Sequence, residues 1–365
     1  MLRTNMRILV IKFRNIGDVL LTTPLIKNLK LNYPDAEIDC LVNKGTEEML
    51  TLNPNIDKIY TYDRNYFKNL PKMKKIVEEF KFLKSFKNYD IVINTTEGDR
   101  GAFIAKFSRA KIKIGFTPKK NLFLKNTFTH KLKNPPLLRH IIENNLDAIR
   151  ILNKKIYEKK VEIFWDEKDN EFIDSFNLPQ KFVHFHPVSR WLFKCINDKI
   201  SAKIIDFIEK ELKLKVVLTS APVKEEMGKI NKILSLTKSN PMNLSGRLTL
   251  KQTAALNKRA KFFVGVDTAI MHISAANDVP VLAFFGPSGA FNWGPWDNDL
   301  FESGYTKKNG FQTMGKHRVI QVDWECAPCG QDGCNGSKIS ECLISGLDFE
   351  FIKKNIEEMN ENTNT

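Results

Sequence analysis

The chain has 365 residues, of which 42% are hydrophobic and 27% are charged. This is the composition of an ordinary folded protein, and it excludes a disordered, a collagenous or a disulfide-stapled chain. The 57 Lys and Arg residues outnumber the 42 Asp and Glu residues, which gives a formal net charge of +15. Because a domain typically holds about 100 to 200 residues, the length predicts two domains.

The excess positive charge lies in the first half of the chain. Residues 1–165 carry 32 basic and 17 acidic side chains, whereas residues 166–365 carry 25 of each. Residues 101–140 contain ten basic side chains and no acidic one. Such a segment predicts an anionic partner, namely nucleic acid, a phosphorylated substrate or an acidic membrane surface. A solvated, lysine-rich face without a partner is the alternative.

Apolar runs alternate with helix-like segments from the start of the chain, which is the pattern of parallel βαβ units. Residues 7–13 (RILVIKF) predict a buried first strand. Residues 18–31 have helical spacing and begin with Asp18, where a carboxylate suits the helix dipole. Further strands of this unit are predicted at residues 37–43, 58–62, 89–95 and 111–116.

The same pattern restarts after a polar stretch at about residues 165–180. Strands are predicted at residues 182–186, 215–219, 242–244, 262–265 and 281–285. Helices are predicted at residues 199–212, 222–236, 249–259 and 268–276. A second α/β unit therefore occupies about residues 175–320, and the last residues of the chain predict a frayed tail. Two doubly wound units in tandem predict a ligand cleft between them.

The sequence contains no stretch of 18 or more apolar residues, and its charged start is unlike a signal peptide, so we expect a cytoplasmic protein. The six cysteines are then expected to be reduced unless they bind metal. Cys40 and Cys195 fit core positions. The other four lie near the end of the chain: Cys326, Cys329, Cys334 and Cys342. Their number suits a tetrahedral zinc site, their spacing is not that of a standard knuckle pair, and redox-labile thiols remain the alternative.

The loop RNIGD at residues 14–18 follows the first predicted strand. In a doubly wound sheet this turn faces the ligand, and Gly17 permits close approach of the backbone to it. Asp18 is either a helix cap or a general base that deprotonates a substrate hydroxyl. The loop lacks the pattern G-x-G-x-x-G, which disfavours an NAD enzyme, and the chain has no P-loop.

Three further motifs end strands of the second unit. The motif HPVSRWLFK at residues 186–194 supplies Arg190 and Lys194, which suit phosphate oxygens. The motif GVDTAIMH at residues 265–272 runs from a strand into a helix whose first amides can bind an anion. Either Asp267 or Thr268 can cap this helix, and His272 is either a ligand of the site or a satisfied core histidine. The motif FGPS at residues 285–288 offers Gly286 for close backbone approach.

Together these motifs resemble the heptosyltransferases of glycosyltransferase family 9, which build the inner core of lipopolysaccharide in Gram-negative bacteria. The resemblance covers nearly the whole chain and is most specific in the D-T-x-x-x-H stretch and its flanks. The cysteine-rich segment CAPCGQDGCNGSKISECL is most similar to the heptosyltransferase III branch.

The resemblance implies a GT-B fold, with two Rossmann-like domains whose parallel sheets face a central cleft. Residues 1–170 would form the acceptor-binding domain, residues 171–350 the nucleotide-sugar domain, and residues 351–365 a tail. The implied reaction is inverting transfer of L-glycero-D-manno-heptose from ADP-heptose to a heptose of the lipopolysaccharide inner core. A transferase of the same family with another nucleotide sugar or acceptor, acting in cell-surface glycan synthesis, is the alternative.

The resemblance also assigns roles to single residues. Asp18 would be the base that deprotonates the acceptor hydroxyl, and Lys194 would hold the donor diphosphate. The full set implied for donor binding is Ser189, Arg190, Lys194, Thr219, Ser220, Asp267, Thr268, His272 and Gly286. A lysine and a helix N-terminus can offset the charge of a departing nucleoside diphosphate, so we predict neither a catalytic metal nor a cofactor.

The basic segment then has a natural partner in the phosphates of the lipid A-core acceptor. We predict acceptor binding by Lys113, Lys119 and Lys120, and peripheral contact with the cytoplasmic face of the inner membrane, where interleaved apolar residues would rest at the interface. A nucleic-acid-binding protein is the competing class. It is disfavoured because the charge is confined to one domain and no helix-turn-helix, RRM or zinc-finger pattern occurs.

Overall fold

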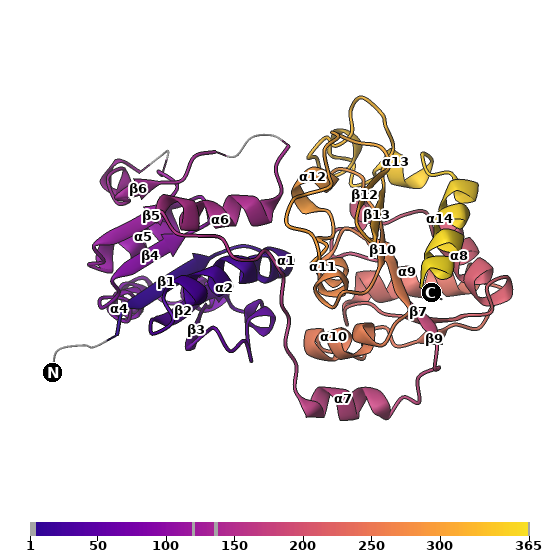
Figure 1. The fold of residues 1–365 in the computed structure, drawn as a ribbon, viewed down its shortest axis with the longest axis horizontal. Helices are drawn as coiled ribbons and strands as arrows, with labels where there is room; N and C mark the ends of the chain where they lie inside the picture. The colour runs from indigo at the N-terminus through magenta and orange to yellow at the C-terminus, as the bar shows by residue number, and fades with distance from the viewer. Residues whose placement is uncertain (1–4, 119–120, 135–137, 364–365) are drawn as a thin grey trace. The chain divides into compact units, whose positions relative to one another are not determined.

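The computed structural model describes residues 5–118, 121–134 and 138–363, and the chain divides into two compact units (Figure 1). The first unit comprises Met1–Leu137 and Ile141–Phe164, and the second comprises Leu138–His140 and Trp165–Thr365. The boundary expected at residue 170 therefore lies within a few residues of the observed one. Within the described ranges, no helix is both long and apolar enough to cross a membrane.

The first unit is built on a parallel sheet with the strand order β3-β2-β1-β4-β5-β6. Its strands are β1 (Arg7–Lys12), β2 (Glu37–Asn43), β3 (Lys58–Tyr62), β4 (Ile91–Asn94), β5 (Ile112–Gly115) and β6 (His130–Lys131). Its helices are α1 (Ile16–Leu20), α2 (Thr23–Asn32), α3 (Arg64–Asn69), α4 (Lys72–Lys84), α5 (Asp99–Phe107) and α6 (Ile141–Ile151), with short 3₁₀ turns η1 (Glu47–Met49) and η2 (Leu122–Leu124).

The strand order of this sheet reverses at β1. β1 pairs with β2 on one side and with β4 on the other, so the connections leave in opposite directions and the strand order reverses at β1. In open parallel sheets, ligands bind outside the carboxyl ends at such a reversal. The loop that carries Asp18 starts at this position.

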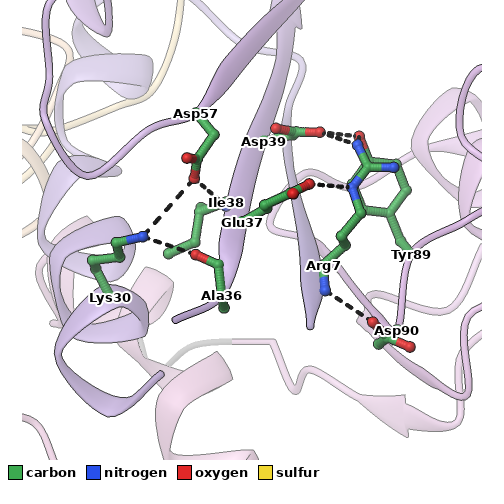
Figure 2. A network of polar contacts seen from close by, with 9 residues as sticks. All are labelled: Arg7, Lys30, Ala36, Glu37, Ile38, Asp39, Asp57, Tyr89 and Asp90. Atoms are coloured by element: carbon green, nitrogen blue, oxygen red, sulfur yellow. Dashed lines mark hydrogen bonds and ion pairs between the residues drawn. The ribbon is translucent and has the colours of Figure 1, made fainter. Parts of the chain in front are cut away.

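A network of charged side chains lies at the amino ends of the strands of this sheet (Figure 2). The buried carboxylate of Asp39 accepts a hydrogen bond from the Arg7 guanidinium at 2.7 Å and another from the Tyr89 hydroxyl. Arg7 also pairs with Glu37 at 2.9 Å, and the Asp57 carboxylate accepts from the backbone N–H of Ile38 at 2.8 Å. Because this network lies at the opposite end of β1 from Asp18, it belongs to the scaffold.

The second unit is built on a sheet with the order β12-β13-β11-β10-β7-β8-β9, parallel except for the β12–β13 pair. Its strands are β7 (Phe182–His186), β8 (Lys215–Leu218), β9 (Met242–Asn243), β10 (Phe262–Val266), β11 (Val281–Phe284), β12 (Gln312–Met314) and β13 (His317–Ile320). Its helices are α7 (Glu167–Asp174), α8 (Asp198–Lys210), α9 (Lys224–Leu236), α10 (Leu250–Lys258), α11 (Ala269–Ala276), α12 (Ala290–Trp293), α13 (Glu341–Ile344) and α14 (Phe349–Asn362), with 3₁₀ turns η3 (Leu192–Lys194) and η4 (Cys334–Gly336).

The end of the chain differs from the tail expected at residues 351–365. Residues 349–362 form α14, which begins at the capping residue Asp348. Ile352, Ile356 and Met359 recur at spacings of four and three, and all three are buried in the core of the second unit. The polar composition of the last residues hid this apolar stripe, which stabilises the helix by burial.

Candidate functional site

Asp18 lies in the short helix α1 that follows β1. The capping residue of this helix is Asn15 and not Asp18, and the Asp18 carboxylate accepts a hydrogen bond from the backbone N–H of Asn15 at 3.3 Å. Lys12, the last residue of β1, lies near Asp18 and is buried, and burial lowers the pKa of Lys12 to about 8 although the Asp18 carboxylate opposes this effect. The Lys12 ammonium donates to Asn145 Oδ1 at 3.0 Å. A charged ammonium near Asp18 favours the ionised carboxylate, which is the form that a general base needs, and the role of Asp18 as a base stays a prediction.

A buried carboxylate organises the corresponding edge of the second sheet. Asp267 follows β10, and its Oδ2 lies 2.6 Å from the Lys194 ammonium and also accepts from the Ser288 hydroxyl. Burial alone would raise the pKa of Asp267, but the Lys194 charge and the two hydrogen bonds outweigh it and hold this pKa below its ordinary value. Three predicted motifs therefore meet at one ionised carboxylate.

The helix α11 begins beside this carboxylate. Thr268 is its capping residue and accepts from the backbone N–H of Met271 at 3.5 Å. His272 lies one turn further along and is buried close to both Asp267 and Lys194. Burial lowers the pKa of His272 to about 4, so the imidazole is neutral at pH 7. The first amides of α11 and the Lys194 ammonium thus provide positive potential at one place.

Thr219 lies at the centre of a buried polar network between β7, β8 and α10. Its hydroxyl is within 2.7 Å of His184 Nε2 and within 2.8 Å of His186 Nδ1. The other ring nitrogen of His184 lies 3.0 Å from the side-chain amide of Asn257, whose oxygen accepts from Asn277. Burial holds the pKa of His184 well below its ordinary value and lowers that of His186 to about 4. Thr219, predicted to bind the donor, is therefore occupied by protein partners.

The remaining residues predicted for donor binding surround this core in different ways. Ser189 is buried and accepts from the backbone N–H of Trp191 at 3.2 Å. Arg190 is exposed, and its guanidinium lies over the Trp191 ring at 5.3 Å. The Ser220 hydroxyl donates to the carbonyl of Ala221 at 3.1 Å. Arg190 alone among these presents a charged group to solvent.

Gly286 is required by packing within the second unit. A Cβ atom built there would lie 2.6 Å from the Leu343 side chain, so the close approach that we expected at this glycine is made by a protein side chain. Gln321 fixes the same loop by donating to the carbonyl of Gly286 at 2.8 Å and to that of Ser288 at 2.9 Å.

The first unit contains a cavity of about 1540 Å³ at the carboxyl side of β1, β4 and β5. Aromatic and aliphatic side chains form much of its wall, including Phe13, Phe80 and Phe103. Arg100 also lines it, and the guanidinium of this residue lies 4.4 Å from the centre of the Tyr62 ring. The sequence does not predict this cavity, because its walls come from segments that are far apart in the chain.

Of the lysines predicted for acceptor binding, Lys113 is described by the structure, and it does not line this cavity. Lys113 lies in β5, and its backbone N–H donates to the Thr129 hydroxyl at 2.8 Å. Burial, with a smaller effect from Lys106, lowers the pKa of Lys113. Lys119 and Lys120 lie outside the described residues. Among the described residues, the basic side chains that line the cavity are Arg100, Lys125 and Lys131, of which the last two belong to the predicted basic segment.

The cysteines separate into two groups, as the sequence predicts. Cys40 and Cys195 are buried in the two cores. Cys326, Cys329, Cys334 and Cys342 line one small cavity of about 30 Å³ beside Gly286. Across the part of the chain that the structure describes, no three side chains of His, Cys, Asp or Glu are placed so that they could hold a metal ion.

Comparison with known proteins decides the family. The family model for glycosyltransferase family 9 (heptosyltransferase) matches residues 80–316, which is well over half of the chain. The chain belongs to glycosyltransferase family 9. It is a glycosyltransferase, and the family resemblance recognised in the motifs is confirmed.

Curated and solved relatives agree with this assignment to family 9. Lipopolysaccharide heptosyltransferase 3 of Escherichia coli is 31% identical over 294 residues, covering 78% of this chain and 85% of that protein. A family 9 glycosyl transferase from Veillonella parvula superposes with a TM-score of 0.81 at 20% identity, over 99% of both chains. The E. coli ADP-heptose lps heptosyltransferase II superposes with a TM-score of 0.73 at 18% identity, over 99% of this chain and 100% of that one. The expected GT-B fold class is confirmed.

Proposed function

We propose that this family 9 enzyme transfers heptose from ADP-heptose, with inversion, to a heptose of the lipopolysaccharide inner core. The observation that carries the proposal is the Lys194–Asp267–Ser288 cluster at the start of α11, which is suited to a diphosphate. The names of the relatives support the sugar and the acceptor, since they are heptosyltransferases of lipopolysaccharide.

The donor diphosphate is held by Lys194 and by the first amides of α11. The ammonium group of a lysine has three N–H donors, and Asp267 uses one of them, so two can point to phosphate oxygens. As the bond between the anomeric carbon and the diphosphate breaks, its electron pair passes to ADP. The positive groups offset the charge that develops there. Asp267 keeps the Lys194 ammonium in place. Because His272 is neutral, it does not compete with Lys194 for the Asp267 carboxylate.

The acceptor hydroxyl is activated by Asp18. Its carboxylate takes the hydroxyl proton while the acceptor oxygen bonds to the anomeric carbon on the face opposite to the leaving diphosphate. General base catalysis of this kind contributes about 10²- to 10⁴-fold to the rate. The backbone N–H of Asn15 fixes one oxygen of the carboxylate, which orients the group for this step.

The acceptor in this proposal is the phosphorylated lipid A-core, bound by the first unit. The excess of basic side chains in the first unit supports an anionic partner. The aromatic walls of the cavity in this unit suit the apolar faces of sugar rings. The predicted roles of Lys113, Lys119 and Lys120 belong to this proposal. So does the peripheral location on the cytoplasmic face of the inner membrane, because the lipid end of such an acceptor stays in a bilayer.

The first test is calorimetric binding of ADP, UDP and GDP to the purified protein. We expect ADP to bind at least about tenfold more tightly than the others, a difference of 1.4 kcal/mol. Release of ADP from ADP-heptose in the presence of a truncated lipopolysaccharide acceptor then tests the transfer itself. Preference for UDP or GDP, or turnover with another nucleotide sugar but not with ADP-heptose, would favour the alternative family 9 transferase.

A further inference from the structure

Helix α4 of the first unit exposes an apolar face to solvent. None of its thirteen residues is buried, and Met73 is 75% exposed. Met73, Ile76, Val77 and Phe80 recur at spacings of three, one and three, so they lie on one side of the helix. The opposite side holds the helix on the unit, because Phe82 packs against aromatic rings of the core. Four exposed apolar side chains on one face of one helix need an explanation.

A second exposed apolar group lies at the same large cavity as α4. It consists of Phe107 at the end of α5 and of Leu122 and Phe123 in η2, and Leu122 is 84% exposed. Phe107 and Leu122 line the same cavity as Ile76 and Phe80 of α4. The exposed side chains of both groups are together called the apolar rim below. The rim therefore borders the cavity with side chains from α4, α5 and η2.

Lysines surround the apolar rim. Helix α4 carries five lysines and two glutamates, a net charge of +3. The Lys84 ammonium lies 4.7 Å from the centre of the Phe80 ring, and that of Lys106 lies 4.0 Å from the centre of the Phe123 ring. Side chains of this kind lay their methylene stems along apolar groups and place the charge at the edge.

This combination distinguishes between two kinds of partner. The centres of protein–protein interfaces are depleted in lysine, because burying an ammonium is costly. An amphipathic helix that lies in a bilayer interface instead combines an apolar face with flanking lysines that attract acidic headgroups. The charges around the apolar rim therefore favour a lipid surface.

We propose that the apolar rim docks into the interfacial layer of a bilayer that contains acidic phospholipids. Met73 and Val77 enter the acyl boundary, and the lysines of α4 contact lipid phosphates. The inference rests on the peripheral location in the proposed function and assigns it to one surface. It also places the mouth of the cavity at the level of the headgroups, where the sugar of a lipid-anchored acceptor begins.

The test is sedimentation of the full-length protein with vesicles of phosphatidylcholine alone or with about one third phosphatidylglycerol. The variant is Met73→Glu with Val77→Glu, since neither residue lines the cavity and both are exposed. The matched control is Val223→Glu with Leu236→Glu, two exposed apolar residues of the second unit. We expect wild type and control to bind the acidic vesicles, in a salt-dependent way, and the Met73/Val77 variant to bind at least about tenfold more weakly.

The outcomes are distinct. If wild type binds neither type of vesicle, the peripheral location itself is wrong. If the Met73/Val77 variant binds like wild type, α4 is not the docking surface. If wild type is an oligomer that the variant converts to a monomer without a change in vesicle binding, the rim is a protein interface.

Transfer to a deacylated, water-soluble acceptor should be equal in wild type and variant, whereas transfer to acceptor in vesicles should fall. This keeps a wrong sugar or acceptor separate from a wrong docking surface.

Discussion

The two units share a doubly wound architecture but differ in their surface charge and in their buried histidines. The first half of the chain has an excess of 15 basic side chains, whereas the second half is balanced. Of the six histidines, His130 lies exposed in the first unit, and the other five are buried in the second: His140, His184, His186, His272 and His317. The first unit carries the excess positive charge, and the second has an interior that contains buried, neutral imidazoles. The same fold thus supports two different electrostatic designs.

The buried histidines predict that acid unfolds the second unit before the first. Burial lowers the pKa of His186, His272 and His317 to about 4 and that of His140 to about 3. Between these values and about 6.5 the unfolded chain binds protons that the folded unit does not, so stability falls as the pH falls through this range. The loss is about 2 kcal/mol for each such histidine between pH 7 and pH 5.

The positions of the tryptophans allow unfolding of the second unit to be followed separately. All five tryptophans (Trp165, Trp191, Trp293, Trp296 and Trp324) belong to the second unit. Urea unfolding followed by tryptophan fluorescence should show a midpoint that falls steeply from pH 7 to pH 5. Proteolysis at pH 5 should leave fragments of the first unit intact. A midpoint that is unchanged over this range would mean that the histidines are not neutral in the folded unit.

Substitution of Asp18 by Asn should separate chemistry from donor binding. The change keeps the size of the side chain and a hydrogen-bond acceptor for Asn15 but removes the base, so transfer should fall about 10³-fold. Because Asp18 belongs to the first unit, calorimetric affinity for ADP should be unchanged. Steady-state transfer within about tenfold of wild type would show that Asp18 serves only as a cap.

Substitution of Lys194 by Ala should have the reverse signature. Loss of a charge-assisted contact with phosphate is expected to weaken ADP binding about 10- to 100-fold, and Asp267 is left as a buried carboxylate without its cation. The matched control is Lys199→Ala, a lysine of α8 on the same unit. Equal ADP affinity of the Lys194 variant and this control would remove Lys194 from the diphosphate site.

The smallest expected effect concerns Lys12, the buried cation of the first unit. Burial lowers its pKa to about 8, against about 10.5 in an unfolded chain. The folded protein therefore releases this proton before the unfolded chain does, and stability relative to a Lys12→Met variant rises by about 1 kcal/mol between pH 7 and pH 9. Paired urea titrations of wild type and variant at both pH values measure this change. A constant difference would mean that Lys12 keeps its proton throughout.

Strands were the elements that the sequence predicted best. The strands predicted at residues 37–43, 58–62 and 182–186 have the same bounds in the structure. The first and the last of these are largely buried, whereas β3 at residues 58–62 is an edge strand without a buried residue. The helix predicted at residues 18–31 is instead two helices, α1 and α2. Pro24 lacks a backbone N–H and belongs in the first turn of a helix, which explains why α2 starts at Thr23.

The sequence predicts which residues belong to the candidate site but not which of them contact one another. Lys194 and Asp267 were both recognised, yet they are 73 positions apart, and no spacing rule indicates that they pair. Ser288 was quoted only as part of a motif, and its bond to Asp267 depends on how β10 and β11 align. The apolar face of α4 was overlooked for a different reason. A helical stripe of apolar residues normally predicts burial, and only the structure shows that this one is exposed.

The network around Thr219 determines which ring nitrogen of His184 carries the proton. Because the Asn257 amide donates to His184 Nδ1, the proton of that imidazole must sit on Nε2, which then donates to the Thr219 hydroxyl. The Thr219 hydroxyl accepts this hydrogen bond and also lies 2.8 Å from His186 Nδ1. A side-chain amide on α10 thus sets the tautomer of a histidine buried in β7, and the Thr219 hydroxyl links that histidine to the HPVSRW motif.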